Sequence, residues 1–310
     1  MTPEEIANLL PAFFAPELRA TYGDDASRVL EGLAQQRPTT LRANTLHATR
    51  QEVADQLTAE GFGFQQVPWY ADAFILEENP SSSLWDSTLI KEGNVYVQSL
   101  SSMLPVLFMD LKPGLDVLDM CAAPGGKTTQ IAALGAGQLH LTACEQNSVR
   151  ADKLDFNLRK QGAANVMVMR QDARKLDSFF SFDRVLLDAP CSGSGTLSAT
   201  DPKLAKRFSE ALVKDSCKKQ AALLQKALEI VKPGGILLYS TCSVLKRENE
   251  EIVAAALKQA AKKGSYKIEA LDLSGFESLP LLPSTLEGAV TVCPTALFEG
   301  FFMCRIRRYA

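Results

Sequence analysis

The 310-residue sequence contains only two histidines, His47 and His140, and its seven cysteines include no Cys-x-x-Cys pair. Protein zinc sites are built mainly from these two residue types at characteristic spacings, so no metal site is expected. The odd cysteine count is also not typical of a disulfide framework. We therefore expect a protein of the reducing cytoplasm, in which a cysteine with a specific role takes part in catalysis rather than in a disulfide bond.

Long apolar runs and a positive net charge are also missing. No run approaches the roughly 18 residues that cross a bilayer, and the acidic start MTPEEIANLL has no signal-peptide pattern, so no membrane partner is expected. This start predicts a helix capped by Thr2, with Glu5 completing a capping box. The net charge of −3 does not indicate nucleic-acid binding, so any basic face must be local. We expect a monomer.

From about residue 115 onward, short apolar runs alternate with amphipathic stretches such as residues 213–231. Continuous hydrophobicity in a short run is typical of a strand buried on both faces, so the alternation predicts a doubly wound α/β domain with a mainly parallel sheet. Residues 288–297 and 300–308 predict an antiparallel hairpin at one edge of this sheet. The expected parallel strands cover residues 115–120, 139–145, 166–170, 183–189 and 235–241.

Residues 1–85 read as a separate, smaller α+β unit. Helical patterns come first, and strand-like pieces follow at residues 40–46 and 62–67. The Pro- and Ser-rich stretch at residues 78–83 is a suitable junction. We therefore expect a small N-terminal domain over residues 1–85 and a main domain over residues 86–310.

Ligands bind to open parallel sheets beyond the carboxyl ends of the strands, and polar or reactive groups follow every expected strand. The loop CAAPGGKT (121–128) lacks the first glycine of a P-loop and the spacing of a dinucleotide fingerprint. A shorter cofactor fits better, with an amino-acid part at the loop, a ribose at Glu145 and an adenine amine at Asp172. A site with these features is suited to S-adenosylmethionine. An acidic residue after a strand is also a common helix N-cap, however, and this is the alternative interpretation of Asp172.

The fourth and fifth expected strands are each followed by a cysteine, in DAPCSGSG (188–195) and YSTCS (239–243). A free cysteine is usually a buried, inert hydrophobe, but a thiolate is also a strong nucleophile. Methylation of carbon 5 of a pyrimidine needs a thiolate that adds at carbon 6, and an acid such as Asp188 would stabilise the resulting charge. Spacing alone does not assign the two cysteines. The cysteines read as core residues are Cys144, Cys217, Cys293 and Cys304.

The motifs LDMCAAPGGKT, DAPCSGSG and YSTCS together resemble those of the Sun-type family of RNA (cytosine-5) methyltransferases, most closely the bacterial 16S ribosomal RNA members. The segments at 95–114, LRANTL (41–46), RENEEIV (247–253) and EGFFMCRIRR (299–308) extend the resemblance to most of the chain. Ser99 departs from the family pattern, which often has an acid at this position. Those members typically carry a further C-terminal RNA-binding region with no counterpart here, which leaves the RNA target open.

The resemblance implies a class I S-adenosylmethionine-dependent methyltransferase (Rossmann-like) core and a small RNA-contacting N-terminal domain. It implies that Cys242 is the attacking nucleophile, that Cys191 assists product release, and that Asp188 faces both base and cofactor. The implied cofactor site comprises Cys121, Ala122, Ala123, Pro124, Gly125, Gly126, Lys127, Glu145, Asp172 and Asp188.

The expected substrate is ribosomal RNA, and the alternative substrate is transfer RNA. A different kind of function is also considered, namely a ribosome-assembly factor that has the same fold but no catalytic activity. The target cytosine should lie in a loop or be flipped out, because a ring stacked in a helix cannot be reached. The basic residues expected to form a collective phosphate-binding surface are Arg42, Lys203, Lys206, Arg207, Arg305, Arg307 and Arg308.

Overall fold

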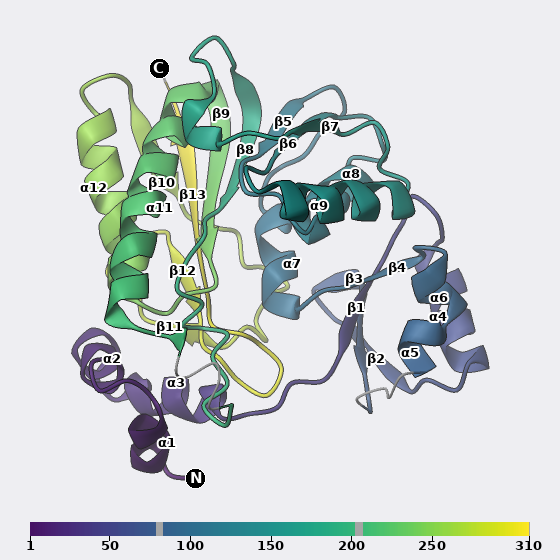
Figure 1. Cartoon of the computed structure of the whole chain (residues 1–310), viewed down its shortest axis with the longest axis horizontal. Helices are drawn as coiled ribbons and strands as arrows, with labels where there is room; N and C mark the ends of the chain where they lie inside the picture. The colour runs from purple at the N-terminus through teal and green to yellow at the C-terminus, as the bar shows by residue number, and fades with distance from the viewer. Residues whose placement is uncertain (79–82, 202–206, 310) are drawn as a thin grey trace.

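The computed structural model describes residues 1–78, 83–201 and 207–309, and its centre is a mixed sheet with the strand order β11-β12-β13-β9-β8-β5-β6-β7 (Figure 1). The neighbours from β9 to β7 pair in parallel, which confirms the predicted α/β sheet. Continuous apolar runs form these strands because both faces of the sheet are covered. The parallel strands are β5 (Asp116–Asp119), β6 (His140–Cys144), β7 (Met167–Met169), β8 (Phe182–Asp188) and β9 (Val231–Thr241).

Helices cover the two faces of this sheet in separate groups. Successive residues of β9 point to opposite faces, so Leu237 and Tyr239 pack with α11 and α12, whereas Leu238 packs with α7, α8 and α9. Figure 1 shows α11 and α12 together on one side. The helices of the main domain are α7 (Leu100–Leu107), α8 (Gly126–Leu134), α9 (Ser148–Lys160), α11 (Glu210–Ile230) and α12 (Glu250–Ala260), with short 3-10 turns η1 (Ala173–Lys175) and η2 (Lys246–Glu248).

The predicted C-terminal hairpin is present and extends the sheet beyond β9. β13 (Phe301–Arg308) pairs antiparallel with β9 on one side and with β12 (Val290–Val292) on the other. Sequence analysis missed two short strands that complete this edge, β10 (Tyr266–Glu269) on β13 and β11 (Leu281–Leu282) on β12. Their few residues carry too little periodicity to be recognised.

A second, smaller sheet has the order β2-β3-β1-β4 and is antiparallel throughout. Its last strand, β4, lies beyond residue 85, so this sheet continues past the predicted domain boundary. The predicted junction falls largely on residues 79–82, outside the described part of the chain. The elements of this unit are β1 (Thr40–Ala43), β2 (Phe64–Val67), β3 (Tyr70–Leu76), β4 (Val95–Val97), α4 (Arg50–Ala59), α5 (Ser83–Asp86) and α6 (Thr88–Lys91).

The first three helices, α1 (Pro3–Leu9), α2 (Phe14–Tyr22) and α3 (Asp25–Leu33), lie apart from the small sheet and beneath the main domain in Figure 1. The predicted capping box at Thr2 is confirmed. Their apolar faces share one core cluster with Phe208, Val213 and Val244 of the main domain. The residues predicted to form one N-terminal unit are therefore divided among three packing clusters, because part of the small sheet packs with the main domain.

Arg42 does not contact solvent, so its predicted place on a phosphate-binding surface is wrong. Its side chain is fully buried and lies with its guanidinium 5.9 Å from the centre of the Tyr96 ring. The Nε atom donates to Gln98 Oε1 (3.1 Å) and an Nη atom donates to Thr129 Oγ1 (2.9 Å). Arg42 thus links β1 of the small sheet to α8 of the main domain.

We expect Arg42→Ala to lower the free energy of unfolding by about 3 kcal/mol, because it leaves a cavity and removes the hydrogen-bond donor of the buried oxygens of Gln98 and Thr129. Urea denaturation measures this loss, and the exposed Arg207 serves as a control whose replacement by alanine leaves stability unchanged. An Arg42→Ala protein as stable as the wild type would contradict the buried linking role.

Candidate active site

The carboxyl ends of β5, β8 and β9 meet at one edge of the main sheet. Asp188, the last residue of β8, lies beside Ser240 of β9, so Cys242 follows two residues further on the neighbouring strand. The fourth and fifth parallel strands, β8 and β9, are therefore neighbours in the sheet.

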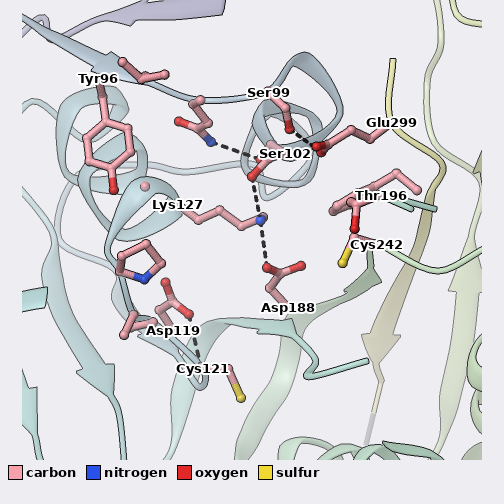
Figure 2. Close-up of a pocket in the computed structure, with 17 residues that line it drawn as sticks. Tyr96, Ser99, Ser102, Asp119, Cys121, Lys127, Asp188, Thr196, Cys242 and Glu299 are labelled. Carbon is pink, nitrogen blue, oxygen red and sulfur yellow. Dashed lines mark hydrogen bonds and ion pairs between the residues drawn. The ribbon is translucent and has the colours of Figure 1, made fainter. Parts of the chain in front are cut away.

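Two cavities open at this edge, with volumes of about 330 and 360 Å³. Four residues line both cavities, namely Cys121, Ala123, Asp188 and Cys242. The Lys127 cavity, shown in Figure 2, is otherwise lined by residues that include Tyr96, Ser99, Ser102, Lys127, Thr196, Glu299 and Phe301. The Glu145 cavity is otherwise lined by residues that include Glu145, Gln146, Arg150, Asp172, Arg174, Pro190 and Cys191.

The glycine loop between β5 and α8 separates the two cavities and forms part of both walls. Gly125 has a φ of 112°, a left-handed conformation that favours glycine, and a Cβ atom there would lie 3.1 Å from Leu154. A Cβ atom on Gly126 would lie equally close to Tyr96, which lines the Lys127 cavity. The two glycines therefore let the backbone pass between these side chains.

The predicted acidic residues gather in the Glu145 cavity. Glu145 is nearly buried, accepts a hydrogen bond from the Asn147 backbone N–H (2.8 Å) and pairs with Arg150 (3.3 Å). Asp172 caps η1 through the Arg174 backbone N–H (3.0 Å) and also pairs with the Arg174 guanidinium. The N-cap interpretation of Asp172 thus describes its contacts in the structure, and its predicted contact with an adenine amine stays a prediction.

Asp188 lies at the junction of the two cavities, where it pairs with Lys127 (Figure 2). The Lys127 Nζ atom lies 2.7 Å from Asp188 Oδ2 and 2.8 Å from Ser102 Oγ, and Ser240 Oγ donates to Asp188 Oδ1 (2.8 Å). Burial alone would lower the pKa of Lys127, but the Asp188 carboxylate outweighs it and holds this pKa above its usual value. Lys127 is therefore a permanent cation beside Asp188.

The two predicted cysteines face each other across the ends of β8 and β9, with their Sγ atoms 3.2 Å apart. Both side chains are partly exposed and both line the Glu145 cavity. The hydrogen bond to Cys242, followed by burial and the negative charges of Cys242 and Glu248, raises the pKa of the Cys191 thiol well above its ordinary value. Cys191 is thus held as a thiol that can donate to the Cys242 sulfur.

Asp119 is a fully buried carboxyl at the end of β5 that sequence analysis did not assign to the site. Burial raises its pKa from an ordinary 3.8 to about 6, against a lowering by the hydrogen bond from Thr128 Oγ1 (2.7 Å). Asp119 lines the Lys127 cavity. The motif LDMCAAPGG contained this residue, but burial of its side chain could not be read from the letters.

Between pH 3.8 and about 6, folded Asp119 binds a proton that the unfolded chain has lost, so its contribution to stability falls as the pH rises through this window. Asp119→Asn keeps an acceptor for Thr128 but cannot bind this proton. From pH 4 to pH 7, we therefore expect the free energy of unfolding of the wild type to fall relative to that of the variant by an amount on the order of 2 kcal/mol. Chemical denaturation of both proteins at several pH values measures the difference. Parallel stability curves would contradict the raised pKa.

The four cysteines predicted to be core residues are largely enclosed by the protein. Cys144, Cys293 and Cys304 are buried and Cys217 partly buried, as expected for core residues, although Cys144 also lines the Glu145 cavity. Sequence analysis missed much of the Lys127 cavity wall, including Tyr96, Thr196 and Phe301. These residues come from segments far apart in the chain. Nothing in the local sequence around any of them distinguishes it from an ordinary polar or core residue.

The C-terminal arginines do not surround the site, and their predicted part in a phosphate-binding surface stays a prediction. Because β13 runs antiparallel to β9, Phe302 pairs beside Thr241 at the site, whereas Arg307 pairs beside Ile236 at the far edge. Arg305 and Arg307 pair with Glu269, and Arg308 donates to backbone carbonyls. Lys203 and Lys206 lie outside the described residues, and Arg207 is exposed.

Among the residues that the structure describes there is no helix that is both long and apolar enough to cross a membrane. Within the same ranges, no three histidine, cysteine or acidic side chains are grouped as a metal ion would require.

Comparison with known proteins places this geometry in a family. A family model described as 16S rRNA methyltransferase RsmB/F matches residues 106–307, and one described as an RsmF/B-like ferredoxin-like domain matches residues 10–82. Ribosomal RNA small subunit methyltransferase F of Shewanella loihica is 36% identical, with 87% of this chain and 56% of that protein covered. Its counterpart from Serratia proteamaculans is 35% identical, with 97% and 63% covered.

Solved structures agree with these sequence matches. The crystal structure of a methyltransferase homolog protein from Pyrococcus horikoshii has a TM-score of 0.83 and 31% identity, and the match covers 99% of this chain and 98% of that one. The chain spans little more than half the length of the first curated relatives it matches. The first family model nevertheless covers more than half of the chain, which therefore belongs to the RsmB/F family of 16S rRNA methyltransferases.

Proposed function

We propose that this chain is an S-adenosylmethionine-dependent RNA methyltransferase that modifies carbon 5 of a cytosine in small-subunit ribosomal RNA through a covalent bond to Cys242. The observation that carries this proposal is the meeting of Cys242, Cys191 and Asp188 at adjacent strand ends beside a glycine loop. Family membership and the names of the ribosomal RNA methyltransferase relatives support the substrate class.

The Glu145 cavity fits the cofactor by its size and its donor set. Its volume of about 360 Å³ lies within the range of about 300–1,000 Å³ that is typical of small-molecule sites. The nearly buried Glu145 carboxylate can accept hydrogen bonds from ribose hydroxyls, and Cys121 and Ala123 of the glycine loop line the same cavity. The residues proposed to hold the cofactor are Cys121 through Lys127, Glu145, Asp172 and Asp188. Of the loop residues, Cys121 and Ala123 line the Glu145 cavity, whereas Ala122, Pro124, Gly126 and Lys127 line only the neighbouring Lys127 cavity.

The Lys127 cavity is the proposed place for the flipped cytosine, because it shares Asp188 and Cys242 with the cofactor cavity. The Cys242 thiolate adds to ring carbon 6. Asp188, once it carries a proton, donates it toward ring N3, so that the negative charge from addition is stabilised. When bound, S-adenosylmethionine supplies an electrophilic methyl group for the activated carbon 5. A water molecule then accepts the carbon-5 proton, the electron pair of that C–H bond re-forms the double bond between carbons 5 and 6, and the bond between carbon 6 and sulfur breaks.

Cys191 is proposed to assist this last step. The electron pair of the breaking bond goes to the Cys242 sulfur, and the Cys191 thiol lies 3.2 Å from that sulfur. A hydrogen bond from a thiol to the departing thiolate stabilises its negative charge. The raised pKa of Cys191 supports this role because it keeps the proton on Cys191.

Nucleoside mass spectrometry after incubation with S-adenosylmethionine tests the proposed activity. We expect 5-methylcytidine in 16S ribosomal RNA or small ribosomal subunits, and bisulfite sequencing then gives the position. Modification of transfer RNA alone would favour the alternative substrate. Absence of 5-methylcytidine from all of these RNAs, with a folded protein that binds ribosomal subunits, would favour a silent assembly factor.

A further inference from the structure

Glu248 is a fully buried carboxyl group that the proposed mechanism does not use. It ends η2, six residues after Cys242, and it is completely shielded from solvent. A buried carboxylate is costly unless its oxygens accept several hydrogen bonds. Its contacts therefore indicate what it holds in place.

Both carboxylate oxygens of Glu248 accept hydrogen bonds from residues that directly follow the two cysteines. Ser192, next to Cys191, donates its backbone N–H to Oε1 (2.8 Å) and its hydroxyl to Oε2 (2.6 Å). Ser243, next to Cys242, donates its hydroxyl to Oε2 (2.6 Å). One carboxylate thus holds both cysteine loops at once.

This connection lies where the pairing of β8 with β9 ends. The Ala189 backbone N–H donates to the Ser240 carbonyl (2.8 Å), and the chain segments then diverge into separate loops. Gln220 of α11 donates to the Pro190 carbonyl (3.1 Å) and to Glu248 Oε1 (3.4 Å), which ties the arrangement to the helix layer. The two loops also meet through the Ser194 and Ser243 hydroxyls (2.8 Å) and through the Gly195 N–H, which donates to the Cys242 carbonyl (3.0 Å). Glu248 differs from these links because its one carboxylate binds the residues directly after both cysteines.

We propose that Glu248 is a positioning residue that sets the separation between the Cys191 and Cys242 sulfur atoms. A carboxylate with two acceptor oxygens can receive donors from both loops, whereas an apolar side chain would leave Ser192 and Ser243 free to choose other partners. The proposed control of the distance between the thiols rests only on the hydrogen bonds of Glu248. The effect of this distance on catalysis rests on the proposed function.

The spacing can be tested without RNA by phenylarsine oxide, whose arsenic forms two As–S bonds with a close pair of thiols and releases water. Binding through both sulfurs depends on their effective concentration, so we expect Glu248→Ala to weaken it by about tenfold. Titration followed by intact-protein mass spectrometry measures the affinity. Cys191→Ser and Cys242→Ser are controls that should each abolish the two-thiol complex.

Glu248→Gln is the matched variant, because it retains the shape and one acceptor oxygen and should keep most of the affinity. If Glu248→Ala fails to fold, the double replacement Ser192→Ala and Ser243→Ala removes the two hydroxyl hydrogen bonds to Glu248 and leaves the one from the Ser192 backbone N–H. Wild-type affinity in a folded Glu248→Ala protein, or in the folded double variant, would overturn the proposal.

A kinetic measurement tests the catalytic consequence. We expect Glu248→Ala to lower kcat by about tenfold or more with little change in KM for RNA, and Glu248→Gln to restore much of the rate. A change in KM alone would contradict a positioning role at the thiols. If the arsenical result is obtained but the wild type never methylates RNA, the proposed function fails while the thiol spacing stands.

Discussion

Cys242→Ala will abolish both methylation and the covalent complex with RNA that carries 5-azacytosine at the target position. Removing the group that forms the covalent bond should lower kcat by at least about 1,000-fold, as for nucleophiles in other covalent enzymes. The structure supports this expectation because the Cys242 sulfur is partly exposed and lines both cavities. Denaturing gel electrophoresis of the protein–RNA mixture measures the complex.

Cys293→Ala is the matched control for this experiment. Cys293 is buried in the cluster formed with the N-terminal helices and lines neither described cavity. Its replacement should leave both the complex and the rate close to wild type. Normal methylation by Cys242→Ala would show that another residue activates the base.

Cys191→Ala is expected to accumulate a covalent complex with ordinary, unmodified RNA. Addition by Cys242 remains intact in this variant, but the departing sulfur loses the thiol that lies 3.2 Å away. The balance therefore shifts from release toward the adduct, and turnover should fall by about 100-fold or more. A gel shift that persists under denaturing conditions and disappears on RNase treatment identifies the complex.

The double replacement of Cys191 and Cys242 by alanine separates this effect from non-specific aggregation. It should form no covalent complex, because the attacking sulfur is absent. A complex of equal yield in the double variant would mean that Cys242 does not form the bond.

Local patterns were sufficient to predict the parallel part of the fold. Each of the five strands from β5 to β9 contains a short apolar run, because helices cover both faces of the sheet, and these runs are visible in the sequence. Their carboxyl ends meet at one edge in any parallel sheet, so the gathering of Asp188 and Cys242 follows from topology.

Arg42 was misjudged because charge in a sequence does not reveal where a side chain lies. Arg42 reads as a surface cation, yet Gln98, Thr129 and the Tyr96 ring enclose it. Arg307 follows the site motif EGFF closely in the chain, but an extended strand carries it about 3.3 Å per residue away from the active edge.

Long-range packing was equally hidden. The Tyr22 hydroxyl of α2 donates to the Val244 carbonyl (2.7 Å), two residues after Cys242, although more than two hundred positions separate them in the chain. The pattern of residues 1–35 predicts helices but contains no information about their partner. For the same reason, the shared hydrogen bonds of Glu248 could not be derived from its place in RENEEIV.

Peptide mapping of the complex formed by Cys191→Ala with unmodified RNA tests the central claim most directly. After nuclease and protease digestion, mass spectrometry should find a cytidine nucleotide attached to the peptide that contains Cys242. An adduct on any other residue, or methylation with no adduct at all, would contradict covalent catalysis by this cysteine.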